Sequence, residues 1–98
     1  MSWANSYIEK LLKQEEVKFR PNGHSMKGKI NDKELVTVKP EIMDNIEIGD
    51  AVLCKVHGKV YLHLVTAKDG KRLQISNNHG HVNGWTKTVY GKVTKVEP

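Results

Sequence analysis

The chain has 98 residues, of which 38% are hydrophobic and 28% are charged, a length and composition typical of one small globular domain. Its one cysteine, Cys54, cannot form an internal disulfide bond or a four-cysteine zinc site. No apolar run approaches the roughly 20 residues that a membrane-spanning helix needs, and no signal peptide is evident. We therefore expect a protein of a reducing, cytoplasmic compartment that does not enter a membrane.

The chain is basic, with 16 lysines and arginines against 11 acidic residues and a net charge of +5. Only Arg20 and Arg72 are arginines, the residue type best suited to forked contacts with phosphates and bases. The lysines are scattered, with acidic residues between many of them. We therefore do not expect nucleic-acid binding as the main role, although a small basic nucleic-acid-binding barrel stays as an alternative.

Residues 1–15 are predicted to form a helix, for which Ser2 is a candidate N-cap. Apolar side chains recur there at spacings of three and four residues, which places them on one stripe. They are Trp3, Tyr7, Ile8, Leu11 and Leu12.

The segment from residue 16 to residue 98 is predicted to be a β domain, because short runs of Val, Ile, Thr and Tyr alternate with Gly, Asn and Asp turns. His57-Gly58 and Asp69-Gly70 are predicted as tight turns, and Gly91 as a bulge or a point of close approach. The predicted strands are Leu35–Val38 (stopped by Pro40), Ala51–Val56, Lys59–Ala67, Lys71–Ser76 and Thr88–Val96.

Two stretches do not fit a regular strand, namely Pro21–Lys33 and Asn77–Trp85. Both are polar and contain two glycines each. Loops that carry function commonly lie on rigid sheets of this kind. These two loops are therefore where we expect the functional residues.

Ser25, in the first loop, has two interpretations. A serine in a Gly-containing loop commonly forms a turn or a cap, whereas a nucleophilic serine needs a base and nearby amide N–H groups. His63 is the best candidate base, because it alternates with apolar residues on the strand KVYLHLVTA, and partial burial would keep its ring neutral. The alternative is a half-buried histidine with a purely structural hydrogen bond.

The motifs around these two residues carry a family resemblance. Four motifs resemble, in their order along the chain, the superfamily of type I signal peptidases and SOS-repressor (LexA-like) serine peptidases. They are GHSMKGKI, LVTVKP, IEIGDAVLCKV and GKVYLHLV. The resemblance implies a mostly β fold, with a coiled, barrel-like antiparallel sheet and an N-terminal helix. It also implies that Ser25 is the nucleophile and that His63 takes the position of the base.

The chain departs from this superfamily in several features. Many members use a lysine base, whereas His63 resembles the histidine of the eukaryotic and archaeal signal peptidases. Gly28 stands where a proline usually follows the Ser-Met motif, which is expected to loosen that turn. Neither a membrane anchor nor a DNA-binding domain with a cleavable linker is evident, so we expect a soluble, standalone member.

The resemblance implies a serine endopeptidase that cleaves an extended peptide or protein substrate by acyl transfer, without a cofactor. The backbone N–H groups of His24 and Ser25 would hold the oxyanion, and a small residue would precede the cleaved bond. The residue that orients His63 is not decided, with Asp50, Asp69 and the pair Asn77-Asn78 as candidates. A homodimer is compatible with an uncovered sheet edge.

Two alternatives to this account stay open. The same fold could serve as a catalytically inactive peptide-binding or regulatory module. His79 and His81, with His57 or His24, could in principle form a zinc site, but no carboxylate or cysteine at ligand spacing accompanies them, so we favour no metal. Cys54 alternates with Val52 and Val56 and is predicted to be an inert core residue.

Overall fold

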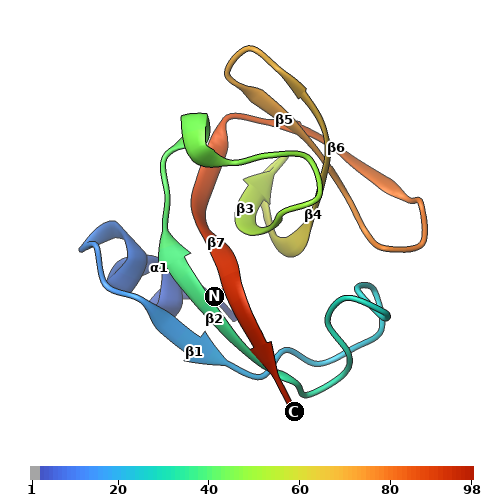
Figure 1. Cartoon of the computed structure of the whole chain (residues 1–98). Coiled ribbons are helices and arrows are strands. Elements are labelled where there is room, and N and C mark those ends of the chain that lie inside the picture. The colour runs from blue at the N-terminus through green and yellow to red at the C-terminus, as the bar shows by residue number, and fades with distance from the viewer. Residues whose placement is uncertain (1–2) are drawn as a thin grey trace.

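The computed structural model describes residues 3–98. They form a mostly β fold in which a single antiparallel sheet follows one N-terminal helix, as the sequence predicts (Figure 1). The elements are α1 (Asn5–Leu12), β1 (Val17–Phe19), β2 (Leu35–Pro40), the 3-10 turn η1 (Met43–Asn45), β3 (Ala51–Val56), β4 (Lys59–Asp69), β5 (Arg72–Ser76), β6 (Val82–Thr86) and β7 (Thr88–Glu97).

The last strand, β7, lies in the middle of the sheet, whose order is β1-β2-β7-β3-β4-β5-β6. The first half of β7 pairs with β3 and the second half with β2, and Gly91 is in register with both Leu53 and Pro40. A Cβ atom at Gly91 would lie 2.5 Å from the carbonyl oxygen of Lys39, so only glycine fits there. The predicted close approach at Gly91 is confirmed, and the long β7 ribbon curves across the coiled sheet (Figure 1).

The predicted strands agree with the structure to within a few residues, and β3 agrees at both ends. The turn between β3 and β4 has positive φ at both central residues, 49° at His57 and 82° at Gly58, as two-residue hairpins of the favoured twist require. In contrast, the prediction that residues 77–85 contain no strand is wrong. Val82–Thr86 pairs with β5, and its irregular residues are accommodated by a bulge.

The N-terminal helix is shorter than the expected segment 1–15. It ends at Leu12 because the backbone enters the left-handed region at Gln14, where φ is 64°. Leu11 is buried as expected, but Leu12 is 67% exposed and does not share the buried stripe. The candidate cap Ser2 lies outside the described residues.

The sheet buries side chains on both faces. On β3, Leu53 joins a cluster beneath α1, whereas Val52, Cys54 and Val56 point to a second cluster on the opposite face. Cys54 is fully buried, which confirms its predicted core position. Strand β4 likewise supplies residues to both clusters, so it is held rigidly from two sides.

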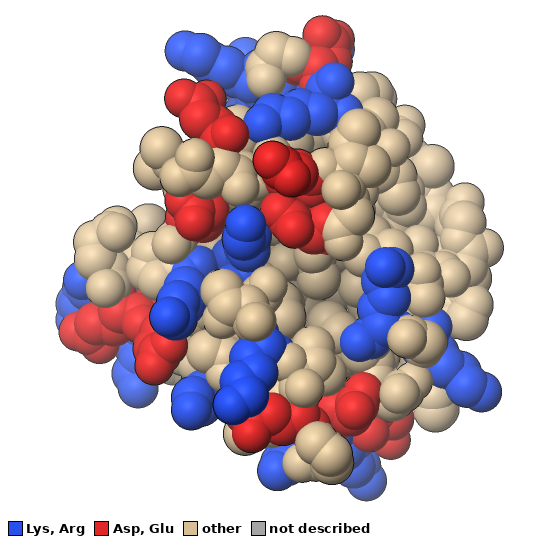
Figure 2. Space-filling view, in the orientation of Figure 1, with Lys and Arg blue, Asp and Glu red and all other residues tan. Residues whose placement is uncertain are grey.

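Charges of both signs are interspersed over the face shown in Figure 2 rather than gathered into one basic patch. Ion pairs such as that between Lys92 and Asp50, at 3.5 Å, join some of them. Among residues 3–98, no helix has the length and apolar character required to cross a membrane.

Candidate active site

Ser25 lies on a compact turn whose neighbours are anchored in the core. Met26 and Ile30 are each only 4% exposed, and the amide of Ile30 donates to the carbonyl of Met26 at 2.8 Å. The amide of Lys27 closes the turn by donating to the carbonyl of His24 at 3.1 Å. Burial of the two apolar side chains fixes the turn, while Ser25 itself stays exposed.

The loop after β5 holds this turn from the other side. The backbone amide of Asn78 donates to the carbonyl of Ser25 at 2.7 Å. The Asn78 side-chain amide donates to the carbonyl of Lys27, and Nε2 of His79 donates to the carbonyl of His24, both at 2.7 Å. Three successive contacts thus fix the backbone around Ser25.

Gly28 has a backbone conformation that proline could not adopt. Its φ is +99°, whereas the proline ring holds φ near −65°. The Gly28 amide also donates to Oδ1 of Asn31 at 3.0 Å, a hydrogen bond that proline cannot make. Gly28 therefore allows a hydrogen-bonded turn that differs from any turn built on proline at this position.

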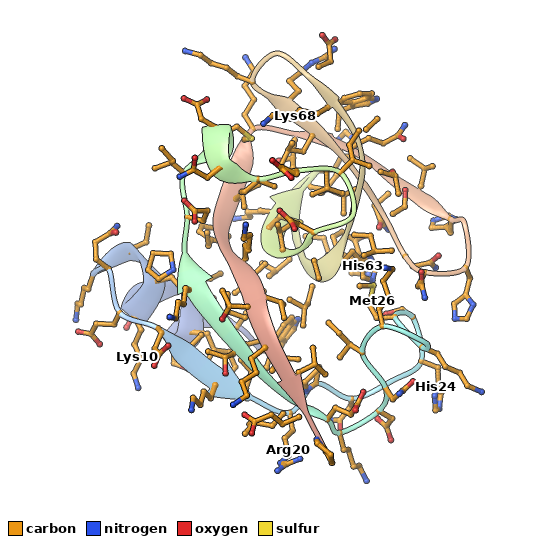
Figure 3. All side chains as sticks on the ribbon, in the orientation of Figure 1. Lys10, Arg20, His24, Met26, His63 and Lys68 are labelled. Atoms are coloured by element: carbon orange, nitrogen blue, oxygen red, sulfur yellow. The ribbon has the colours of Figure 1, made fainter. Side chains whose placement is uncertain are left out.

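His63 projects from the middle of β4 toward Ser25. Its Nε2 atom lies 3.1 Å from Oγ of Ser25, and the residue is only 8% exposed. Figure 3 shows His63 beside Met26, where the turn that carries Ser25 approaches the sheet. The structure therefore brings together the hydroxyl and the imidazole that the sequence singled out.

Asn83 contacts the other nitrogen of the same ring. Its Oδ1 atom lies 2.6 Å from Nδ1 of His63. An amide oxygen only accepts hydrogen bonds, so the neutral ring carries its proton on Nδ1 and presents a lone pair on Nε2 to Ser25. This is the tautomer that a general base needs.

A β-bulge places Asn83 at the ring. Ile75 pairs with Gly84 and Ser76 pairs with Val82, so Asn83 is the extra residue of β6. Bulges commonly redirect a side chain beside a functional site. The next residue is Gly84, whose φ of +140° is rarely adopted by residues with a side chain, and a Cβ atom there would lie 2.8 Å from Nε2 of His57.

The protein environment lowers the pKa of His63 below its ordinary value. Burial of the ring is the main cause, because it disfavours the imidazolium. The hydrogen bond to Asn83 acts in the opposite direction, and the charge of His81 lowers the pKa further. The net effect keeps the ring neutral, and able to accept a proton, at neutral pH.

None of the candidates for the orienting residue occupies that position. Asp50 accepts from the amide of Glu47 and pairs with Lys92, and Asp69 forms an exposed ion pair with Arg72 at 2.9 Å. Oδ1 of Asn77 accepts from two amides of its own loop, and Asn78 holds the serine turn. The sequence indicated the correct loop but the wrong asparagines.

A cavity of about 190 Å³ opens beside the Ser–His pair. Both Ser25 and His63 line it, together with consecutive residues of β4 from Val60 to Leu62. Strand β5 joins β4 only from Leu64 onward. Within residues 3–98, no strand pairs with that edge of β4 between residues 59 and 63, so this edge is open toward the cavity.

The histidine-rich loop brings together no metal-ligand set. Within the part of the chain that the structure describes, no three His, Cys, Asp or Glu side chains are grouped so that they could hold a metal ion. The thiol of Cys54 is not expected to be reactive, because burial raises its pKa to about 12 and so disfavours the thiolate.

The model of a known protein family, described as Peptidase S24-like, matches residues 5–91. The chain belongs to the Peptidase S24-like family. This match extends from α1 into β7 and includes both Ser25 and His63, so it supports the resemblance that the ordered motifs indicated. No curated protein matches the chain at a significant level.

Proposed function

We propose that this Peptidase S24-like protein is a serine endopeptidase that cleaves an extended peptide by acyl transfer. The observation that carries the proposal is the 3.1 Å separation between Oγ of Ser25 and Nε2 of a buried His63. A hydroxyl at this distance from an uncharged imidazole can lose its proton as it attacks a carbonyl.

In the first step, Oγ of Ser25 bonds to the carbonyl carbon of the substrate, and its proton passes to Nε2 of His63. The carbonyl electrons move to the oxygen, and the amide N–H groups of His24 and Ser25 donate to that oxyanion. The C–N bond then breaks, and the imidazolium returns the proton to the leaving amine. Water repeats the sequence on the acyl-enzyme and releases the acid.

Asn83 has the role of a positioning residue in this mechanism. Its carbonyl oxygen holds the Nδ1–H of His63 at 2.6 Å and thereby selects the ring orientation and the tautomer. A neutral amide stabilises the imidazolium less than a carboxylate does. The pKa of the base consequently stays low, which suits catalysis near neutral pH.

The open edge of β4 supports the substrate class. An extended peptide can add to an unpaired strand edge through main-chain hydrogen bonds, and its alternate side chains then enter pockets. The edge between residues 59 and 63 lies along the cavity that contains Ser25. The resemblance further suggests that a small residue such as Ala or Gly precedes the cleaved bond.

An inactive peptide-binding or regulatory module of the same fold is the second candidate, because a groove that binds a strand need not cleave it. A nucleic-acid-binding role has less support, since basic and acidic side chains are interspersed on the face shown in Figure 2. A cytoplasmic location and a homodimer stay predictions.

The test uses a mixed peptide library digested by the purified chain, with new termini identified by mass spectrometry. We expect Ser25→Ala and His63→Ala to abolish cleavage while thermal unfolding stays cooperative. The matched controls are Ser6→Ala on exposed α1 and His57→Asn in the β3–β4 turn, where asparagine tolerates positive φ. If Ser25→Ala cleaves as fast as the parent, the peptidase proposal is wrong; if the parent binds peptides without cleaving them, the binding module is favoured.

A further inference from the structure

Trp3 is a large aromatic side chain that stays 54% exposed at the start of the N-terminal helix. Its ring is nevertheless held in place, because it packs against Phe19 at 5.7 Å and Tyr7 at 6.3 Å between centroids. Tyr7 and Phe19 are themselves stacked at 4.4 Å. The exposed face of Trp3 is therefore a fixed apolar surface rather than a freely rotating side chain.

This surface forms one wall of the cavity that contains Ser25 and His63. The same cavity is lined by the apolar side chains of Met26, Ile30, Val60 and Leu62 and, at other points, by the uncharged polar side chains of Asn22, Asn31 and Tyr61. Its lining residues, which all belong to the described part of the chain, include no Asp, Glu, Lys or Arg. A charged side chain placed there would lose water without gaining an opposite charge.

The size of the cavity matches one bulky side chain. Its volume is about 190 Å³, and apolar cavities of about 150 Å³ bind a benzene ring. A phenylalanine or leucine side chain therefore fits. The family match begins at residue 5, so the Trp3 wall lies outside the part of the chain that the family model describes.

We propose that Trp3 and the neighbouring apolar residues form a substrate subsite that selects a bulky apolar side chain, phenylalanine or leucine, in the peptide bound along β4. This inference rests on the proposed peptidase function. The bulky side chain is distinct from the small residue expected next to the cleaved bond, because successive side chains of an extended peptide point to opposite sides. Only some of them can enter the cavity.

The experiment uses blocked octapeptides of Gly, Ser and Ala in which one guest residue, Gly, Leu, Phe or Glu, occupies each position in turn. We expect Phe or Leu at one position to raise kcat/KM at least about tenfold over Gly, in the range that apolar pockets give, and Glu to give no gain. Trp3→Ala should remove most of this preference, measured as the ratio of kcat/KM for the Phe and Gly peptides. Leu12→Ala, at an exposed leucine of the same helix, should retain the ratio.

Two further measurements keep the proposal separable from folding and from catalysis. Trp3→Leu retains an apolar contact with Phe19 and should lower the ratio for Phe peptides even if Trp3→Ala unfolds. Peptide binding to Ser25→Ala should show the same preference without cleavage. A preference in binding with no cleavage by the parent chain would support the subsite and overturn the peptidase function.

Two other results would overturn the subsite proposal but not the peptidase proposal. Cleavage with less than about twofold difference among guests at every position, or an equal loss for all peptides in Trp3→Leu, would contradict the proposal while the peptidase function stands. If the peptides are neither cleaved by the parent chain nor bound by Ser25→Ala, both proposals are wrong.

Discussion

Replacing Asn83 with aspartate tests how the imidazole is controlled. The new carboxylate would lie about where Oδ1 now lies, 2.6 Å from Nδ1 of His63, and would stabilise the imidazolium. Such a neighbour shifts a pKa by about 1 to 3 units. Asn83 is half-buried, so water screens part of the effect, and we expect the lower half of that range.

The sign of the effect on activity follows from the role of His63 as a base. The ring must be neutral to accept the proton of Ser25, so kcat/KM falls when the pH drops below the pKa of His63. In the parent chain burial lowers that pKa, which puts the acidic limb of the profile below about pH 6.5. In Asn83→Asp the limb moves to higher pH by about 1 to 2 units, while full activity returns on the alkaline plateau.

Asn83→Ala is the matched control. It removes the hydrogen bond that raises the pKa of His63, so the limb moves slightly to lower pH. It also leaves the ring unoriented, and the plateau should fall by up to the factor of about 10² to 10⁴ that general-base catalysis contributes. The assay is kcat/KM against pH for one cleaved peptide with all three chains. An unmoved limb in Asn83→Asp would refute the assignment of His63 as the base.

Unfolding provides a second readout that does not depend on substrate. In the parent chain the folded pKa of His63 is depressed, so between that pKa and about 6.5 the unfolded state binds more protons and stability rises with pH. In Asn83→Asp the new carboxylate raises the folded pKa of His63 from its depressed value. The rise of stability with pH below about 6.5 is then smaller than in the parent chain, because the folded state binds its proton at higher pH. Urea titrations at several pH values measure this change, and an unaltered slope would contradict it.

Three further predictions concern the scaffold. Gly91→Ala should lower the free energy of unfolding by about 1–3 kcal/mol, because its Cβ would lie 2.5 Å from the carbonyl of Lys39; a change within about 0.5 kcal/mol, as at ordinary surface sites, would contradict the packing at β7. Asn78→Ala removes the side-chain hydrogen bond to the carbonyl of Lys27 and should lower kcat/KM about tenfold through misplacement of Ser25, without moving the acidic limb of the pH profile. An unchanged kcat/KM would show that this hydrogen bond does not position Ser25. Cys54, fully buried with its pKa raised to about 12, should react with a disulfide reagent at pH 8 only after addition of urea, and rapid reaction of the folded chain would show that the core at β3 is open.

The sheet was predictable from the sequence where alternating apolar residues are bounded by turn residues. Ala51–Val56 and the turn at His57-Gly58 are of this kind, and both the period and the turn chemistry are local properties. In contrast, the three residues Val17–Phe19 are too few to show a period. The end of the helix was missed because it depends on a left-handed Gln14, which composition does not indicate.

The proposed Ser–His pair was predictable in part, because ordered motifs identified Ser25 and an alternating strand identified His63. The residue that orients the His63 ring was not predictable from the sequence. Asn83 reaches the ring only because the pairing of β5 with β6 shifts between Ile75 and Ser76. A bulge of this kind is a property of the register between two strands. The Asn-Gly pair of residues 83–84 was the one local signal, and it is equally typical of a turn.

Reaction of the folded chain with a serine-directed fluorophosphonate, located by peptide mass spectrometry, tests the central claim most directly. The account predicts a single adduct on Oγ of Ser25, absent from Ser25→Ala, and slowed strongly in His63→Ala because the hydroxyl then lacks its base at 3.1 Å. Failure to label Ser25, or labelling at the same rate with and without His63, would contradict it.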